Sequence, residues 1–132
     1  MSKEQFWQGV EQFNHREFYH CHDTLEALWI DALEPDRRFY QGILQIAVGC
    51  YHLGNHNWRG AVILLGEGIR RLGSYQPDYR GINVSSLVGE SQKLLHYLQK
   101  TGSSKIAMVA KQLENVSGND AQRFPYILTV NH

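Results

Sequence analysis

Three side chains in the first quarter of the chain have a spacing that could support chemistry. His22, Glu26 and Trp29 stand at positions i, i+4 and i+7, which on an α-helix is one face over two turns. An imidazole and a carboxylate on the same helical face can share a hydrogen bond, exchange a proton or ligate one divalent metal ion together. We therefore expect any site to be organised around the stretch 18–29.

The apolar pattern of this stretch predicts that His22 and Glu26 face inward. Both fall inside the apolar stripe of the expected helix, whose other members are Phe18, Cys21, Leu25, Leu28 and Trp29. Because a polar group that faces a core is costly unless it is hydrogen-bonded or ligated, we expect a buried pair completed by a neighbouring helix.

The next expected helix offers such partners. If the two helices form an antiparallel hairpin about Pro35, residues whose numbers sum to about 70 lie level. This register places Glu26 opposite Gln45 and Phe18 near His52, and it sets Trp29 against Gly42 and His22 against Gly49. The sequence thus predicts a polar pocket between the helices, formed by His22, Glu26, Trp29, Gln41, Gln45 and His52.

Three roles are compatible with this pocket. The first is a hydrogen-bonded cluster that is structural or receives a small ligand, and no cofactor is firmly implied. The second is a divalent-metal site for zinc, iron or manganese, with His22, Glu26 and His52 as ligands and a metal-dependent hydrolase as its extension. The third is a protein–protein interaction module. No nucleophile accompanies the pair, so catalytic residues are unknown and enzymatic activity stays open.

The composition of the chain limits the classes of partner that are expected. With 132 residues the chain fits one domain, 1–132, and its 13 basic side chains balance 13 acidic ones. This balance does not favour a nucleic-acid partner, and no apolar run approaches the roughly 20 residues of a membrane span. Cys21 and Cys50 are expected to be small buried thiols, although the hairpin register sets them level, and the chain is expected to be cytoplasmic.

The periodic segments predict an all-α fold: a single compact bundle of five to six helices with a central antiparallel hairpin and an extended C-terminal tail. Phe6 and Trp7 on the first helix form a candidate homodimer face. Asn57 and Asn83 are expected N-caps. The tail covers 123–128, and about 116–122 is expected to be flexible. The helices are expected at 2–13, 16–32, 35–53, 58–72, 84–101 and 105–114.

The spacing His22-x3-Glu26-x2-Trp29 resembles the hallmark of domain of unknown function 309, a family of uncharacterised bacterial and archaeal proteins. The resemblance implies a compact helical domain and a motif suggested to bind metal, but no reaction. Asp23 departs from the glutamate common in the family. Other matching positions are Phe13-Asn14, Phe18-Tyr19, Gln41-Gly42, Ala47, Tyr51-His52, Gly60-Ala61, Gly81-Ile82 and Pro125.

Overall fold

The described chain is built from helices linked by short turns. A computed structural model describes residues 2–114 and 123–130, and these contain six α-helices, two 3₁₀ turns and one two-stranded antiparallel sheet. The predicted all-α fold is confirmed, and the segment expected to be flexible lies outside the described residues. The α-helices are α1 (Ser2–Asn14), α2 (Phe18–Asp31), α3 (Asp36–Gly54), α4 (Trp58–Leu72), α5 (Val84–Thr101) and α6 (Ile106–Glu114).

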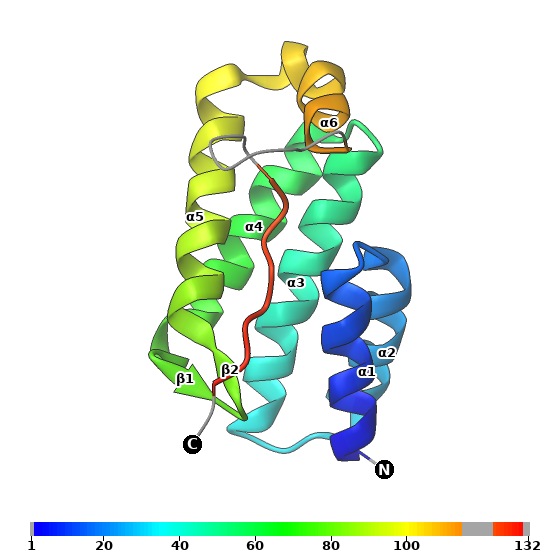
Figure 1. Ribbon diagram of the computed structural model, residues 1–132, viewed down its shortest axis with the longest axis vertical. Coiled ribbons are helices and arrows are strands. Elements are labelled where there is room, and N and C mark those ends of the chain that lie inside the picture. The colour runs from blue at the N-terminus through cyan, green and yellow to red at the C-terminus, as the bar shows by residue number, and fades with distance from the viewer. Residues whose placement is uncertain (1, 115–122, 131–132) are drawn as a thin grey trace.

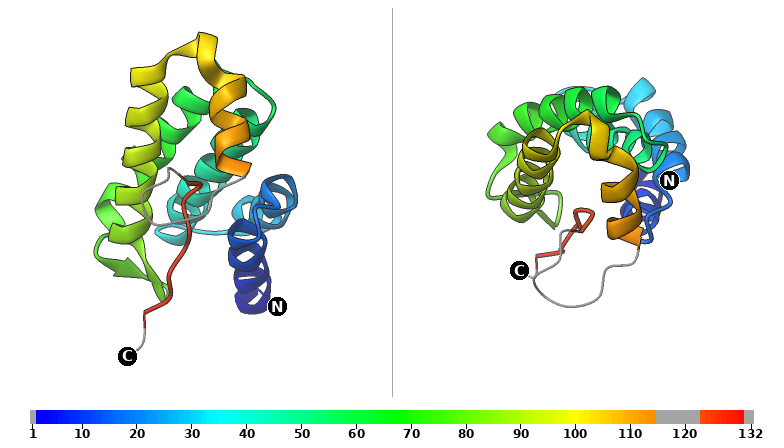
Figure 2. Two further views of the ribbon diagram at one scale, coloured as in Figure 1. Left: turned by 45° about the horizontal axis from the view of Figure 1, so that its top comes forward. Right: turned by 90° about the horizontal axis from the view of Figure 1, so that it is seen from above.

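Helix α3 is the central element. It packs against α2 on one side and α4 on the other, α1 packs on α2, and α5 packs on α4 (Figure 1). Seen from above, the helices curve around the extended C-terminal segment (Figure 2). The buried positions of α3 are spread widely around the helix, as expected for an element with neighbours on several sides. They are Phe39, Tyr40, Gly42, Ile43, Ile46, Ala47, Gly49, Cys50 and Leu53.

Glycines bring α3 and α4 into close contact. A Cβ atom added at Gly42 would lie 2.7 Å from Leu72 Cγ, and one at Gly49 would lie 3.0 Å from Leu65 Cγ. On the facing helix, a Cβ atom at Gly68 would lie 2.7 Å from the carbonyl oxygen of Gly42. The glycines of α3 therefore make room for α4 and its side chains.

The contacts between α3 and α4 correct the partners predicted for the glycines of α3. We expected Gly42 to receive Trp29 and Gly49 to receive His22, but both glycines face α4. The physical reason is that α3 has two helical neighbours, and a small residue allows close approach to either of them. The sequence pattern alone does not say which neighbour a glycine meets.

The helix ends follow their local sequence. The Asn57 side chain accepts a hydrogen bond from the Gly60 N–H at 2.9 Å, and the Asn83 side chain accepts one from the Ser86 N–H at 2.9 Å. Both predicted N-caps are confirmed. Gly102 follows α5 with a φ of +79°, a conformation that costs glycine little.

The segment between α4 and α5 folds back on the bundle. It contains a 3₁₀ turn (Gly73–Tyr75) and the strands β1 (Asp78–Tyr79) and β2 (Ile82–Asn83), in the interval between the helices expected at 58–72 and 84–101. The Tyr75 hydroxyl donates to the Pro35 carbonyl at 2.7 Å, and the Tyr79 hydroxyl donates to Asp36 Oδ1 at 2.6 Å. The hairpin is therefore tied to the start of α3. None of the described helices is long and apolar enough to cross a bilayer.

Candidate functional site

The predicted site residues lie on a groove that follows α3. His22, Glu26 and Trp29 of α2 form one wall, and Leu64 of α4 belongs to the other. The hollow that they enclose has a volume of about 310 Å³. Its floor comes from one stripe of α3, formed by Gln41, Leu44, Gln45 and Val48.

A second hollow of about 270 Å³ continues the first. His22 and Val48 line both, and the second adds Phe18, Tyr19, Tyr51 and His52. We call the two hollows together the α3 groove. Of the predicted pocket residues, five therefore line the first hollow, while His52 lines the second beside Phe18, as the predicted hairpin register implied. Glu26 and Gln45 share the first hollow, also in keeping with that register.

The polar pair sits on the wall of the groove and not in the core. His22 Nε2 lies 3.3 Å from Glu26 Oε2, and His22 Nδ1 lies 3.3 Å from Asp23 Oδ1. The His22 side chain is 28% exposed and that of Glu26 is 48% exposed. The prediction that Glu26 is buried is therefore wrong.

The turn of α2 explains the difference. Its buried side chains are Phe18, Cys21, Leu25 and Leu28, and each motif residue follows one of the last three by a single position. One residue turns an α-helix by about 100°, so His22, Glu26 and Trp29 come out at the edge of the core-facing stripe. They are placed where a helix surface meets both its neighbour and solvent.

The ring of Trp29 packs against the guanidinium group of Arg37. The Arg37 guanidinium lies 4.3 Å from the centre of the Trp29 ring, and its Nε–H donates to the Trp29 carbonyl oxygen at 3.3 Å. Contacts of this kind stabilise an aromatic ring beside a cation. The indole N–H of Trp29 is buried and has no hydrogen-bond partner among the described residues, which is costly for a polar group.

The opposite edge of the groove is held by a charged network. Arg71 of α4 donates to Gln45 Oε1 at 3.1 Å and lies 3.5 Å from Glu67 Oε1. The side chain of Arg71 is only 18% exposed. The side chain of Gln45 is therefore oriented by its hydrogen bond from Arg71 of α4. It does not complete a buried pair with Glu26, contrary to the prediction from the sequence.

The structure does not gather a set of metal ligands at the groove. Within residues 2–114 and 123–130, no three His, Cys, Asp or Glu side chains lie close enough to hold one metal ion. His22 and Glu26 contact each other, whereas the Nδ1 atom of His52 lies 3.3 Å from the side-chain amide nitrogen of Asn57. Metal binding by His22, Glu26 and His52 thus stays a prediction.

The two thiols are separate from this site. Cys21 and Cys50 are free and buried, as expected. Burial raises the pKa of the Cys21 thiol to about 12, and burial together with the neighbouring Cys21 raises that of Cys50. Neither is poised as a nucleophile, because only the thiolate attacks.

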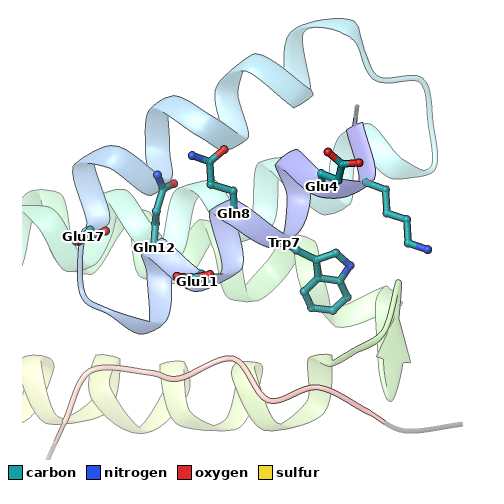
Figure 3. Close-up of a pocket in the computed structure, with 7 residues that line it drawn as sticks. Glu4, Trp7, Gln8, Glu11, Gln12 and Glu17 are labelled. Carbon is teal, nitrogen blue, oxygen red and sulfur yellow. The ribbon is translucent and has the colours of Figure 1, made fainter.

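A wider and shallower hollow lies along α1. Its volume is about 770 Å³, and α1 together with Glu17 supplies its whole lining (Figure 3). Trp7 points from it toward the β1–β2 hairpin, where its ring would lie 3.2 Å from a Cβ atom at Gly81. Phe6 is 2% exposed and packs edge-on against Trp7 at 5.2 Å. Phe6 is therefore part of the protein's own core, whereas Trp7 is half-buried and lines the hollow, and a homodimer through this face stays a prediction.

The apolar part of the groove was missed at the level of sequence. It consists of Leu44 and Val48 of α3 and Leu64 of α4, and none of these three is among the predicted pocket residues. The signal was present, since Gln41, Leu44, Gln45 and Val48 follow the i, i+3, i+4, i+7 pattern of one helical face.

Comparison with known proteins shows that this chain is similar to a protein family and to a curated relative. Residues 6–64 match the family described as Domain of unknown function (DUF309). A relative described as uncharacterized protein YpuF, from Bacillus subtilis (strain 168), is 31% identical over 109 residues, which are 82% of this chain and 55% of the relative. The chain thus spans about half the length of this curated relative. Every residue that lines the α3 groove falls within the matched range. The segment 6–64, which carries the α3 groove, thus belongs to the DUF309 family.

Proposed function

We propose that this protein is an interaction module whose α3 groove binds an amphipathic helix of a partner protein. The observation that carries the proposal is the open groove itself, which has apolar side chains on its floor beside two glutamines and an exposed carboxylate on its α2 wall. An enclosed polar cluster would have favoured a structural role. The exposed Glu26 leaves both the pair and the floor beside it accessible to a ligand.

The dimensions of the groove suit a short helix. Its floor follows α3 from Gln41 to His52, which is about 17 Å at 1.5 Å per residue. About three turns of a partner helix have the same length. Leu44, Val48 and Leu64 offer apolar contacts to such a helix, which would place its own apolar side chains at i, i+3 or i+4, and i+7.

The rim adds a requirement on the partner's charge. Asp23 and Glu26 project from the α2 wall with side chains 62% and 48% exposed. Farther along the groove, the rings of Tyr19 and Tyr51 pack at 5.4 Å and are 52% and 41% exposed. Carboxylates and aromatic faces both attract lysine and arginine, so a partner helix with a basic edge would bind best.

Selection from a displayed library of amphipathic helical peptides tests the proposal. The wild-type protein serves as bait, and Val48→Glu, which puts a charge on the groove floor, serves for counter-selection. We expect enriched peptides to combine an apolar stripe with lysine or arginine on one edge. Their affinity should fall about tenfold or more for Val48→Glu, and should be unchanged for Met108→Glu, which places the same charge at an exposed apolar position on α6, outside the groove.

A charge reversal separates specificity from simple stickiness. Peptides selected on the wild type should bind Glu26→Lys less tightly, because a basic edge then meets a basic wall. Circular dichroism and thermal unfolding must show that each variant is folded. If folded Val48→Glu and wild type enrich the same peptides with the same affinities, the groove is not a docking site.

A further inference from the structure

A second binding surface is visible in how the chain holds its own C-terminal segment. Residues 123–130 run as an extended segment between α5 and α1, across α3 (Figures 1 and 2). Phe124, Pro125 and Ile127 are buried, while Tyr126 and Leu128 are 49% and 44% exposed. The segment thus presents apolar side chains to the bundle and others to solvent, as a bound extended peptide does.

Its backbone is bound by groups distant in sequence. The Asn14 side chain makes two bonds to Ile127, donating to its carbonyl oxygen at 2.9 Å and accepting from its N–H at 2.7 Å. The Tyr126 N–H donates to Glu90 Oε1 at 2.9 Å. The Asn14 side chain therefore makes the same two hydrogen bonds to Ile127 that a residue on a neighbouring antiparallel strand would make.

The β1–β2 hairpin continues this recognition. The Asn83 N–H donates to the Leu128 carbonyl oxygen at 2.8 Å, and the Val130 N–H donates to the Gly81 carbonyl oxygen at 2.9 Å. Ile82 and Thr129 form an antiparallel bridge between these two bonds. The segment therefore adds a strand to the free edge of β2, which is one of the common modes of peptide recognition.

The side-chain contacts give the surface its selectivity. The ring of Phe124 packs on Phe18 at 5.1 Å, and the Arg16 guanidinium lies 5.5 Å from its centre. Together with buried Pro125 and Ile127, these contacts select an aromatic-Pro-x-aliphatic segment in extended form. We call the surface made by Asn14, Arg16, Phe18, Gly81, Asn83 and Glu90 the tail seat.

We infer that the tail seat is a peptide-binding site in its own right, and that residues 123–130 of a second copy of this chain can occupy it. Every group of the tail seat named above belongs to α1, the turn that follows it, α2, the β1–β2 hairpin or α5. An identical segment from another copy would therefore find the same contacts. The chain's own segment competes at an effective concentration on the order of mM, so exchange should grow as protein concentration approaches that range.

Disulfide trapping between full-length chains tests this exchange. Asn83 follows Ile82 and Leu128 precedes Thr129, so Asn83 and Leu128 lie opposite each other as the next pair along the two strands. Residues of such a hydrogen-bonded pair have Cα atoms about 5.5 Å apart, within the disulfide range. Asn83→Cys is placed on one chain and Leu128→Cys on another, and the two are mixed in a glutathione redox buffer. We expect a covalent heterodimer that increases with concentration and is linked through positions 83 and 128 in peptide mapping.

Two controls make the outcome decisive. The double variant Asn83→Cys, Leu128→Cys should close its own disulfide within one chain, and its failure to do so would overturn the geometry of the tail seat. Asn83→Cys mixed with Met108→Cys, an exposed position on α6, measures random collision. The exchanging pair should give about tenfold more heterodimer than this control near mM concentration. Equal yields would overturn the inference.

A second pair guards against loss of the Asn83 cap. Ile82→Cys and Thr129→Cys probe the bridge pair itself, which lacks direct hydrogen bonds between its residues and therefore brings the Cα atoms closer. If the variants of both cysteine pairs are folded, both mixtures should form the covalent heterodimer. Unmixed wild type reports any background from Cys21 and Cys50.

Discussion

Gly68 of α4 offers a sharp test of how α3 and α4 approach each other. A Cβ atom at this position would lie 2.6 Å from Ile46 Cγ1 and 2.7 Å from the carbonyl oxygen of Gly42. A side-chain atom can rotate away, but the carbonyl oxygen belongs to the backbone of α3. Gly68→Ala therefore forces the two helices apart.

The size of the effect follows from two opposing contributions. Overpacking a dense interface costs about 1–3 kcal/mol, and we take the upper end because one clashing atom is backbone. Alanine in place of glycine within a helix recovers about 1 kcal/mol. The net loss of unfolding free energy should be about 2 kcal/mol for Gly68→Ala.

Gly66, two residues earlier on the same helix, is the matched control. The nearest neighbour to a Cβ atom there is Leu95 Cδ2, at 4.0 Å, so alanine fits without displacement. Gly66→Ala should gain about 1 kcal/mol, and the two midpoints of thermal unfolding should then differ by roughly 10 °C. Urea unfolding followed by circular dichroism gives the free energies directly. A Gly68→Ala protein as stable as Gly66→Ala would show that α3 and α4 do not approach as described.

Three further predictions concern single side chains. Glu26→Ala should change the unfolding free energy by less than about 0.5 kcal/mol in urea unfolding, since the side chain is 48% exposed, whereas a loss of several times that size would return Glu26 to the core. Ser91→Ala should raise stability by about 1 kcal/mol, because the Ser91 hydroxyl is fully buried without a hydrogen-bond partner in the described part of the chain; an unchanged or lower thermal midpoint would indicate a partner there. Hydrogen bonds from Arg80 and Tyr79 hold the pKa of Asp36 below its ordinary value, so its contribution to stability is complete above pH ~4 and disappears as pH falls through the lowered pKa. The stability difference between wild type and Asp36→Asn should shrink over that acidic range, and a constant difference would contradict the pairing.

Local sequence rules predicted the helices well. The N-caps Asn57 and Asn83 are recognised from one side chain and the chain that follows it, so no distant contact is needed to identify them. The β1–β2 hairpin escaped this approach, because two-residue strands carry no periodicity. It forms because Tyr75 and Tyr79 find partners at the start of α3, about 40 residues away in sequence.

The faces of the helices were harder to predict than their limits. A stripe of residues has an angular width, and its edge is set by how neighbouring helices cross. For α2 the deepest positions are Cys21 and Leu25, so residues one position later lie at the boundary. The sequence placed His22 and Glu26 in the correct region between helices but could not decide on which side of that boundary their polar atoms lie.

The position of the His22–Glu26 pair at this boundary changes what the motif can do. A buried pair would contribute to folding, and its loss would weaken every function of the protein through stability. An exposed pair beside an apolar floor adds little to stability, because water competes for both partners. Its carboxylate can therefore be replaced with little effect on the fold, while any ligand that contacts the α2 wall should respond to the change. Glu26→Lys should accordingly leave the thermal midpoint almost unchanged and alter the charge preference of bound peptides. A loss of stability that accounts for the whole loss of binding would return the motif to a structural role.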